Sequence, residues 1–323
     1  MAIVGCGLIG KKRKAALGKA RLVACVDRDL SRAQSLAAGS PEAIAATSLD
    51  QVLRHNIDIV VVATTNDALA DTACAALDAG CHVIVEKPAA RTVAELDRIK
   101  TAAGRAQRLV RVGFNHRYHP ALLKAKEIVD SGALGPLMFV RGRYGHGGRL
   151  GYDREWRADP VLSGGGELID QGVHLIDLSR WYLGAEFTEI AGFAGTFYWD
   201  MPVDDNAFLT LRTATGATAF LHMSCSEWKN LFSLEIYGRN GKLHIEGLGG
   251  SYGVERLTWY RMLPEMGPPE TEAWEFPRGD RSWELEFGEF LDDIAANRTP
   301  AAGLSDARAA LAVVERIYRN GTP

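Results

Sequence analysis

The sequence predicts an α/β fold with two domains: a doubly wound parallel sheet first, then a domain built on a largely antiparallel sheet. Up to about residue 113, short strands that are apolar throughout alternate with helical stretches, which indicates a parallel sheet covered on both faces. From Glu189 to about Tyr260, several strand-like stretches are separated by turns such as Asn240-Gly241. The length of 323 residues also favours two domains over one.

The first domain is expected to span residues 1–118. Its strands are short and apolar, and two of its helices end at glycines, Gly39 and Gly80. The helix after Thr92 begins with a capping box, because Glu95 follows three positions later. The predicted strands are 2–4, 22–26, 57–63, 82–85 and 109–113, and the predicted helices follow Gly10 and cover 31–38, 49–53, 68–79 and 92–104.

The second domain is expected to span residues 119–323, and its C-terminal helix could pack back on the first domain. Pro120 opens a helix that runs to about Asp130, and 137–144 alternates like a strand with one exposed face. The glycine-rich residues 145–166 predict a loop, and the prolines in 264–277 predict another. Helices are predicted over 167–183, 282–296 and 304–318.

Composition and charge are those of a soluble globular protein. The net charge of −3 gives no electrostatic reason to expect nucleic acid or a membrane surface as a partner. The basic run 11–14 could be a localisation signal, but it follows a glycine-rich turn at once, so we interpret it as the solvated first turns of a helix. No apolar stretch approaches the roughly 20 residues that cross a bilayer, and the basic run follows the apolar one, unlike in a signal peptide. We therefore expect a cytoplasmic protein.

The five cysteines support a reducing compartment. They are an odd number, widely spaced, and include no C-x-x-C pair, which argues against a disulfide framework and a structural zinc site. We interpret them as small buried residues. They are Cys6, Cys25, Cys74, Cys81 and Cys225.

A glycine-rich turn, Gly5-Cys6-Gly7-Leu8-Ile9-Gly10, follows the first strand and opens a helix. The motif alone is a weak signal, but this context is typical of a Rossmann dinucleotide site. The glycines let the backbone turn tightly and approach a pyrophosphate at the helix N-terminus. Asp27, at the end of the second strand, can accept hydrogen bonds from the adenosine ribose. The alternative is a tight turn with Asp27 as an ordinary loop residue.

Asp27 also bears on the choice of cofactor. A carboxylate repels a 2′-phosphate, so the residue favours NAD over NADP. The adjacent Arg28 could instead pair with that phosphate, which leaves NADP possible.

Three further segments of the sequence are informative when they are considered together. They are Glu86-Lys87-Pro88, the stretch G-F-N-H-R-Y-H-P over 113–120, and G-G-G-E-L-I-D-Q-G-V-H-L-I-D over 164–177. With the glycine-rich turn, their order and spacing resemble the Gfo/Idh/MocA oxidoreductase family, to which glucose–fructose oxidoreductase and inositol dehydrogenase belong. The resemblance covers essentially the whole chain. It implies a Rossmann domain followed by an α/β domain with an open, mostly antiparallel sheet that often makes dimer or tetramer contacts.

The resemblance also implies site residues. Lys87, Asp170 and His174 hold the catalytic places, and the Lys87–Pro88 peptide bond is expected to be cis. One departure is local: the family's T-P-N-x-x-H-like turn here has Leu69 at the histidine position, so no role is carried over to that residue. The candidate cofactor neighbours are Gly5, Gly7, Leu8, Ile9, Gly10, Asp27, Arg28, Thr64, Asn66, Glu86 and Lys87.

The three catalytic candidates suit the oxidation of a secondary alcohol. That reaction needs a base for the hydroxyl proton and a donor for the developing alkoxide. His174 is the natural base, since an ordinary histidine has a pKa near about 6.5. Asp170, four positions earlier in a predicted helix, shares its face and can orient the imidazole or bind a substrate hydroxyl. Lys87 follows a parallel strand, where ligands of open α/β sheets bind, and can polarise the oxygen.

Simpler interpretations remain open for these residues. A strand-end lysine can be a solvated charge, and an aspartate and a histidine four apart can form a salt bridge or half of a metal site. We expect no metal, because no third ligand is evident from spacing. Glu86 could contact the nicotinamide side or cap its turn. Asn115 and Arg117 could line the cleft, although we favour a role in fastening the domain junction.

Arginines before the catalytic helix raise the hypothesis of an anionic substrate. Arg141 and Arg143 share one face of a predicted strand. Arginine suits bidentate recognition of phosphate or carboxylate. The alternative is that this face meets solvent or another subunit and that acidic loop residues neutralise the loop arginines. The loop arginines are Arg149, Arg154 and Arg157, the acidic residues are Asp153, Glu155 and Asp159, and the candidate substrate residues are Lys87, Arg149, Trp156, Asp170 and His174.

The leading hypothesis is an NAD(P)-dependent dehydrogenase of a sugar, cyclitol or sugar derivative that forms a homodimer or homotetramer. A sensor that keeps the nucleotide site but lacks catalysis is a second hypothesis, which loss of the lysine or of the Asp–His pair would favour. An NAD-assisted enzyme that carries out a non-redox reaction on sugars is a third.

Overall fold

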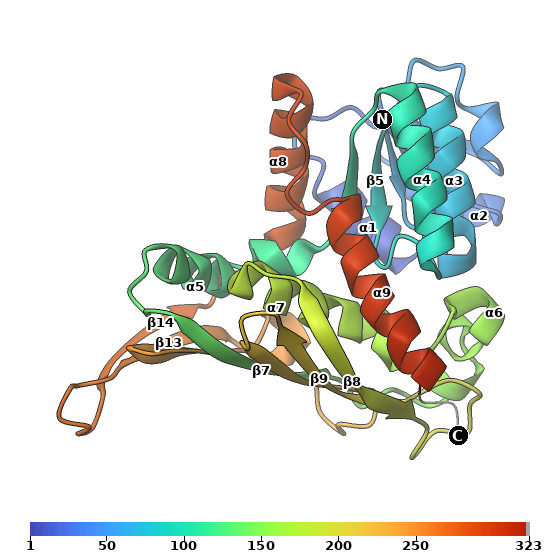
Figure 1. Cartoon of the computed structure of the whole chain (residues 1–323). Coiled ribbons are helices and arrows are strands. Elements are labelled where there is room, and N and C mark those ends of the chain that lie inside the picture. Colours follow the sequence, from blue (N-terminus) through green and yellow to red (C-terminus); the bar gives the residue numbers. More distant parts are fainter. Residues whose placement is uncertain (321–323) are drawn as a thin grey trace. The chain divides into compact units, whose positions relative to one another are not determined.

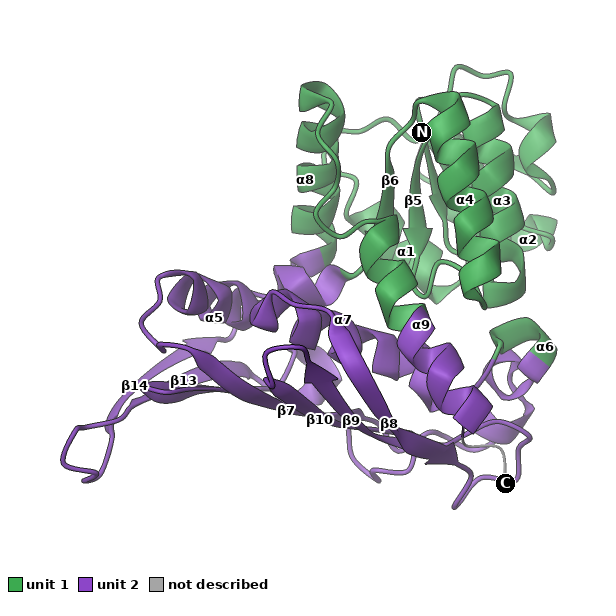
Figure 2. Cartoon of the chain, viewed as in Figure 1, with its two compact units in different colours: residues 1–114, 161–164, 283–311 green, residues 115–160, 165–282, 312–323 purple. Residues whose placement is uncertain are grey.

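The computed structural model describes residues 1–320, which divide into two compact units (Figure 2). Unit 1 comprises residues 1–114, 161–164 and 283–311, and unit 2 comprises the remaining segments. The sequence suggests two continuous domains, 1–118 and 119–323. The units are instead discontinuous, because α8 (Ser282–Ala296) and the first part of α9 (Leu304–Asn320) group with unit 1.

Unit 1 contains a six-stranded sheet in which every pairing is parallel. Its strand order, β3-β2-β1-β4-β5-β6, is that of a doubly wound Rossmann fold, as predicted. The edge strand β3 was not predicted from the sequence; it is three residues long and half of its surface is open. The strands are β1 (Ala2–Val4), β2 (Ala24–Val26), β3 (Ile44–Ala46), β4 (Ile59–Val62), β5 (His82–Glu86) and β6 (Val110–Gly113).

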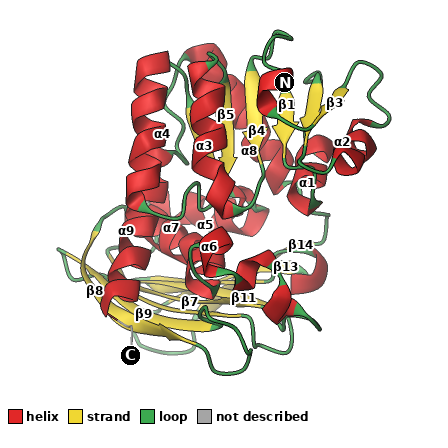
Figure 3. Cartoon of the chain, turned by 90° about the vertical axis from the view of Figure 1, so that its right-hand side faces the viewer, coloured by secondary structure: helices red, strands yellow, loops and turns green. Residues whose placement is uncertain are grey.

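Helices cover both faces of this sheet. On one face α3 and α4 lie side by side (Figures 1 and 3). The hydroxyl of Thr92 caps α4 by accepting a hydrogen bond from the Glu95 N–H at 3.1 Å, as predicted. The helices are α1 (Leu8–Ala15), α2 (Leu30–Ala37), α3 (Asn66–Asp78), α4 (Val93–Ala106) and α6 (Pro160–Ser163), with a 3₁₀ turn at Leu49–Gln51.

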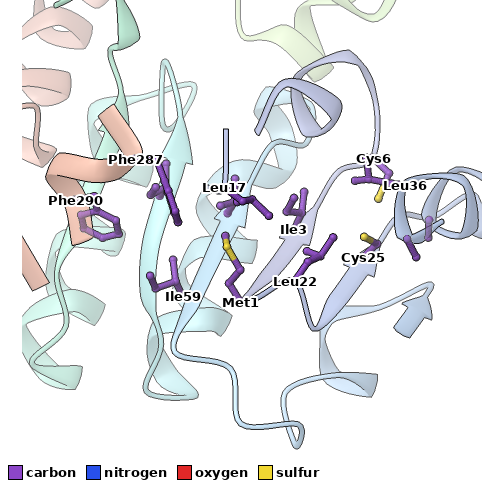
Figure 4. Close-up of a cluster of buried hydrophobic side chains, with 14 residues drawn as sticks. Met1, Ile3, Cys6, Leu17, Leu22, Cys25, Leu36, Ile59, Phe287 and Phe290 are labelled. Carbon is purple, nitrogen blue, oxygen red and sulfur yellow. The ribbon is translucent and has the colours of Figure 1, made fainter. Parts of the chain in front are cut away.

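The hydrophobic core on the opposite face of the sheet is closed by α8. Phe287 and Phe290 of this helix are buried in one cluster with Ile3, Ile59 and other strand residues (Figure 4). Side chains alternate along a strand, so every second residue of β1 and β4 points to this face. The helix that closes this core therefore begins 169 positions after the last strand of the sheet ends.

Two arginines are buried in unit 1 against α8. Arg13 binds Glu86 at 2.5 Å and Glu286 at 2.6 Å, and Arg111 binds Asp293. The prediction that the basic run 11–14 is solvated is wrong for Arg13, which is 1% exposed. Helical periodicity turns this position toward the core, where the two carboxylates compensate the buried charge.

Unit 2 contains an eight-stranded sheet in the order β14-β13-β12-β11-β7-β10-β9-β8. Only the β7–β10 pair is parallel, so the predicted mostly antiparallel sheet is confirmed. Helices α5 (Pro120–Asp130) and α7 (Val173–Leu183) pack on it. The strands are β7 (Leu137–Gly145), β8 (Phe187–Gly195), β9 (Asn206–Thr213), β10 (Thr218–Ser224), β11 (Leu231–Gly238), β12 (Gly241–Glu246), β13 (Glu255–Arg261) and β14 (Glu270–Phe276).

Strand β14 corrects the sequence-based loop over 264–277. The prolines at 264, 268 and 269 confine the loop to the turn before the strand, and Pro277 follows its end. β14 is an edge strand, so it needs pairing partners on one side only, and it pairs with β13. The cluster of prolines therefore predicted the turn correctly, but it gave no indication of the strand that follows. Among residues 1–320, no helix is long and apolar enough to span a membrane.

Candidate active site

The glycine-rich turn of unit 1 forms a cradle that is open at its middle position. A Cβ on Gly5, whose φ is +94°, would lie 2.2 Å from the Ala63 oxygen, and one on Gly10 would lie 2.1 Å from the Gly5 oxygen. A Cβ on Gly7 would meet nothing within 4 Å. The outer glycines thus allow close packing, while the middle one leaves the backbone accessible to a pyrophosphate.

Asp27 is held at the end of β2 by backbone N–H groups. Its carboxylate accepts hydrogen bonds from the Cys6 N–H at 2.8 Å and from the Asp29 N–H at 3.0 Å. Asp27 is half-buried and Arg28 is exposed. The carboxylate therefore joins β2 to the glycine-rich loop at the place where a ribose would bind, which fits a dinucleotide.

The loop after β4 contains two of the predicted cofactor neighbours. The Thr64 hydroxyl donates to the Thr65 carbonyl at 3.1 Å. Asn66 is buried, and its amide donates to the Ser163 carbonyl at 2.8 Å. The side-chain amide of Asn66 therefore links α3 to the segment 161–164 within unit 1.

Glu86, Lys87 and Pro88 follow β5 directly. The Lys87–Pro88 bond is cis, as the resemblance implies, and Lys87 is half-buried. Glu86 is buried, and its carboxylate binds Arg13. This ion pair anchors the residue before Lys87 to α1.

In unit 2, Asp170 and His174 lie at the start of one continuous helical segment. Asp170 is in a π-helical turn, Leu168–Gly172, and His174 is in the first turn of α7. The helix predicted over 167–183 is thus present, and its first part is π rather than α. Such turns are frequent at functional sites.

Asp204 fastens the beginning of that segment. Its carboxylate accepts the N–H groups of Gly166 and Leu168 at 2.9 and 2.8 Å, and the Tyr318 hydroxyl at 2.7 Å. These bonds satisfy N–H groups that the first helical turn leaves without intrahelical acceptors. Burial raises the pKa of Asp204, against the lowering effect of these donors.

Arg157 contacts Asp170 from the preceding loop. Its Nε lies 3.0 Å from a carboxylate oxygen, and its guanidinium lies 4.6 Å from the Trp156 ring centre. Burial is the largest effect on the pKa of Arg157 and acts to lower it, but the charge and hydrogen bond of Asp170, with the neighbouring Tyr152 and Glu155, together raise this pKa. The carboxyl group of Asp170 therefore lies next to a permanent cation.

His174 is buried among aromatic rings. Its ring stacks on His116 with centroids 3.7 Å apart, and Tyr144 meets it edge-on at 6.2 Å. Burial raises the pKa of Tyr144 well above its ordinary value, and it raises that of Tyr252 to about 12. Both tyrosines are consequently neutral near pH 7.

The arginines of β7 and its loop have acidic or aromatic neighbours. Arg141 binds Glu235 at 2.6 Å, and Arg149 binds Glu155 at 2.7 Å. A Cβ on Gly142 would contact Leu175 of α7, so the alternating positions 141 and 143 project to the opposite face of the sheet. These contacts favour the alternative in which acidic residues neutralise the arginines.

Asn115 and Arg117 make contacts inside unit 2. The Asn115 amide donates to the Ser282 hydroxyl at 2.9 Å, which joins the first residue of unit 2 to the residue where its second segment ends. Arg117 binds Asp177 at 2.5 Å through a buried ion pair. Both contacts lie within unit 2, so the fastening of the domain junction by these residues stays a prediction.

Two family models match the chain. Residues 1–114 match the oxidoreductase family with an NAD-binding Rossmann fold, and residues 122–244 match the GFO/IDH/MocA C-terminal domain. The chain belongs to the Gfo/Idh/MocA oxidoreductase family. Unit 1 contains the NAD-binding Rossmann domain of this family, and the resemblance noted from the sequence is confirmed.

Two curated relatives of this family member are named as a sugar and a cyclitol dehydrogenase. Levoglucosan dehydrogenase of Pseudarthrobacter phenanthrenivorans is 29% identical over 223 residues, 58% of this chain and 55% of that protein. Inositol 2-dehydrogenase 2 of Saccharopolyspora erythraea is 31% identical over 224 residues, 66% of this chain and 63% of that protein. The matches thus span less than two thirds of these relatives.

A solved structure extends the similarity to nearly the whole fold. Aldose–aldose oxidoreductase from Caulobacter crescentus, complexed with glycerol, superposes with a TM-score of 0.87 at 26% identity. The superposition covers 98% of this chain and 96% of that chain. The family fold therefore continues beyond the segments that the family models match.

Three residues near the candidate site of this family member were missed as site residues from the sequence: His116, Arg157 and Asp204. His116 lies within a quoted motif and Arg157 among the loop arginines, but neither pattern indicates which residue it contacts. Asp204 lies 34 positions after Asp170, and no local spacing connects them. Only the fold brings these residues to the helix of Asp170 and His174.

Proposed function

We propose that the chain is an NAD-dependent dehydrogenase that transfers a hydride between nicotinamide and a secondary hydroxyl of a sugar, cyclitol or sugar derivative. The observation that carries the proposal is that the surrounding structure fixes the positions of Lys87, Asp170 and His174. Lys87 follows a parallel strand at the same edge of the sheet as the dinucleotide loop, and Asp170 and His174 share a helical segment fastened by Asp204. Such preorganisation is what proton and hydride transfer require.

His174 is the proposed base. The raised pKa values of Tyr144 and Tyr252 argue against a tyrosinate in this role. Asp170, paired with Arg157, would bind a substrate hydroxyl, since a carboxylate can accept several hydrogen bonds at once. Lys87 would hold the oxygen that develops charge.

NAD is the proposed cofactor, and when bound it accepts or supplies the hydride. The glycine cradle and the carboxylate of Asp27 are the residues that would hold it. Arg28 is exposed to solvent. The negative charge of Asp27 repels a 2′-phosphate and so favours NAD over NADP.

We also propose that the protein works as a homo-oligomer in the cytoplasm. The sheet face opposite α7 exposes aromatic side chains, among them Phe193 at 51% and Phe220 at 53%. A second copy of the same face is the occupant that suits such a patch, because a two-fold interface pairs like surfaces. The five free cysteines, four of them buried, agree with a reducing compartment.

A substrate panel tests the activity. Sugars, cyclitols, sugar phosphates and nucleotide sugars are mixed with the purified chain and NAD, and NADH absorbance is followed. We expect turnover of neutral sugars or cyclitols, since Arg141 and Arg149 are already paired with carboxylates. Tight NAD binding without turnover of any member would contradict the dehydrogenase and favour a sensor.

A further inference from the structure

The closest ring contact in unit 2 joins two histidines. The imidazoles of His116 and His174 lie 3.7 Å apart, centre to centre, with an angle of 23° between their planes. Both residues are buried, with 7% and 3% of their surfaces exposed. His116 belongs to a 3₁₀ turn, Asn115–Tyr118, so the ring that covers His174 comes from a separate element.

Other rings hold this pair in place. Tyr144 of β7 contacts His116 at 5.2 Å and His174 at 6.2 Å between centroids. Phe232 of β11 packs edge-on against His116 at 6.1 Å. Rings on several elements therefore restrict how far either imidazole can rotate.

The hydrogen bonds of Asn115 determine whether one ring nitrogen of His116 carries a hydrogen. The amide of Asn115 donates to Ser282, so its oxygen faces His116 Nδ1 at 3.2 Å and accepts a hydrogen from it. Nδ1 therefore carries a hydrogen whether the ring is neutral or charged. A neutral His116 is compatible with every contact described for it.

Charged and titratable groups surround the pair on several elements. His119 is edge-on to His116 at 5.6 Å and is paired with Glu255 at 3.0 Å and with Asp280 at 3.9 Å. The other such groups on elements packed against the two rings are Tyr144 and Tyr252, the carboxylates Glu167 and Asp170 with Arg157, and the Arg117–Asp177 ion pair.

Two positive charges cannot easily occupy rings in this arrangement. At this separation, repulsion between two imidazolium ions would shift the second protonation by roughly two to three pH units. A neutral ring facing a charged one is instead attractive, as in a cation–π contact. The arrangement favours at most one proton on the two rings.

We propose that His116 is a positioning residue for the base: its ring fixes the plane of His174, and the pair binds one proton rather than two above about pH 5. The proposal rests on the proposed function, in which His174 accepts the hydroxyl proton. The O–H bond breaks and an N–H bond forms on His174, while His116 stays neutral. Oxidation then requires both rings to be neutral beforehand.

Histidine titration by NMR tests the shared proton without any substrate. The protein is labelled with ¹⁵N-histidine, and ring shifts are followed from pH 9 to pH 5 in the wild type, His116→Phe and His174→Phe. In the wild type we expect the two rings together to hold about one proton at pH 5. One of the two rings should remain neutral at pH 5 in the wild type. In the variant in which the other ring is replaced by Phe, the protonation midpoint of this ring should rise by roughly two pH units.

Two results would overturn the shared proton. One is that the wild-type rings together hold two protons at pH 5. The other is that neither Phe variant changes the midpoint of the remaining ring, in which case burial alone controls protonation. His222→Phe is the matched control, because it removes a histidine that stacks on Phe208 at 4.3 Å, on the other face of the sheet.

Kinetics test the positioning role. We expect His116→Ala to lower kcat by about 10-fold or more with KM within about 2-fold, since a rotated base misses its proton. His116→Phe should recover most of kcat, because it restores a flat cover. Equal kcat values in the wild type and His116→Ala, or equal losses in the Ala and Phe variants, would contradict this role.

The two levels of the proposal fail separately. If the wild type oxidises no sugar but the titration shows one shared proton, the proposed dehydrogenase is wrong and the coupling of the rings stands. If sugars are oxidised and the rings titrate independently, the dehydrogenase stands and the role of His116 is wrong.

Discussion

At the residue scale, the carboxylate of Asp27 both holds the glycine-rich loop and affects the choice of cofactor. Its carboxylate accepts the N–H of Cys6 in the glycine-rich loop and that of Asp29 ahead of α2. The same charge opposes a 2′-phosphate on the adenosine ribose. The choice of cofactor and the shape of the loop are therefore linked through one side chain.

Replacing Asp27 by alanine should weaken NAD binding and narrow the preference for NAD over NADP. We expect about a 10-fold or larger rise in the Kd for NAD, since a charge-assisted hydrogen bond and a loop contact are both lost. Kd values for both cofactors, measured by calorimetry, check this. Asp29→Ala is the control, because this neighbouring carboxylate caps α2. If the wild type binds NADP more tightly than NAD, the attraction of Arg28 for the 2′-phosphate exceeds the repulsion by Asp27.

Lys87 is the second single residue with a testable role. Lys87→Met should leave the Kd for NAD within a few-fold and lower turnover by about 100-fold or more, as expected for loss of a transition-state contact. Single-turnover rates and cofactor titrations separate the two effects. The exposed Lys100 on α4 serves as control when changed to Met. Unchanged turnover in Lys87→Met would remove this lysine from the mechanism.

At the scale of the element, α8 carries a carboxylate into the interior of unit 1. Glu286 is fully buried against Arg13, and burial raises its pKa from 4.5 to about 7, with Arg13 acting in the opposite direction. A carboxyl whose pKa is higher in the folded state stabilises the fold fully below its unfolded pKa. That contribution is lost as pH rises from about 4.5 through about 7.

The unfolding free energy should therefore fall between pH 5 and pH 8, by up to about 3 kcal/mol. Glu286→Gln resembles the protonated form and should flatten this slope, with a stability at pH 8 equal to or above that of the wild type. Urea unfolding at both pH values measures it. Glu289→Gln, at a half-exposed position on the same helix, should keep the wild-type slope. An unaltered slope in Glu286→Gln would assign the pH dependence to other groups.

The elements also show what the sequence could and could not predict. Periodicity and capping found α5 and α8 within a residue of their ends, because both patterns depend on neighbours in the chain. The glycine-rich turn and its carboxylate were found for the same reason. The ring of His116 and the carboxylate of Asp204 were missed, since each reaches α7 from a distant part of the chain. Arg13 was misjudged because a basic run does not reveal which member faces inward.

At the scale of the whole molecule, the open face of the unit 2 sheet exposes several aromatic side chains. Phe208 stacks on His222 there, and Phe193 packs against Phe208. Clusters of this kind on a sheet face are typical of an interface. The surface is continuous across neighbouring strands β8, β9 and β10.

A charge placed on this face should dissociate the proposed oligomer. Phe220→Glu, in the middle of β10, should shift the sedimentation coefficient from that of an oligomer to that of a monomer, because an unpaired charge would be buried between two copies. Leu123→Glu is the control, since it adds the same charge at an exposed position on α5. A wild type that sediments as a monomer, or a Phe220→Glu variant that stays oligomeric, would contradict the interface.

The path of the chain through unit 1 has a consequence for protein synthesis. The six strands of the parallel sheet leave the ribosome first, within residues 1–114, but Glu286 and Asp293, which neutralise Arg13 and Arg111, are made only after the whole unit 2 sheet. Until α8 is made, the Rossmann sheet has two inward-facing guanidiniums without these carboxylates and an apolar core that lacks Phe287 and Phe290. A fragment that ends at residue 114 would therefore lack part of its own core, because Phe287 and Phe290 would be missing.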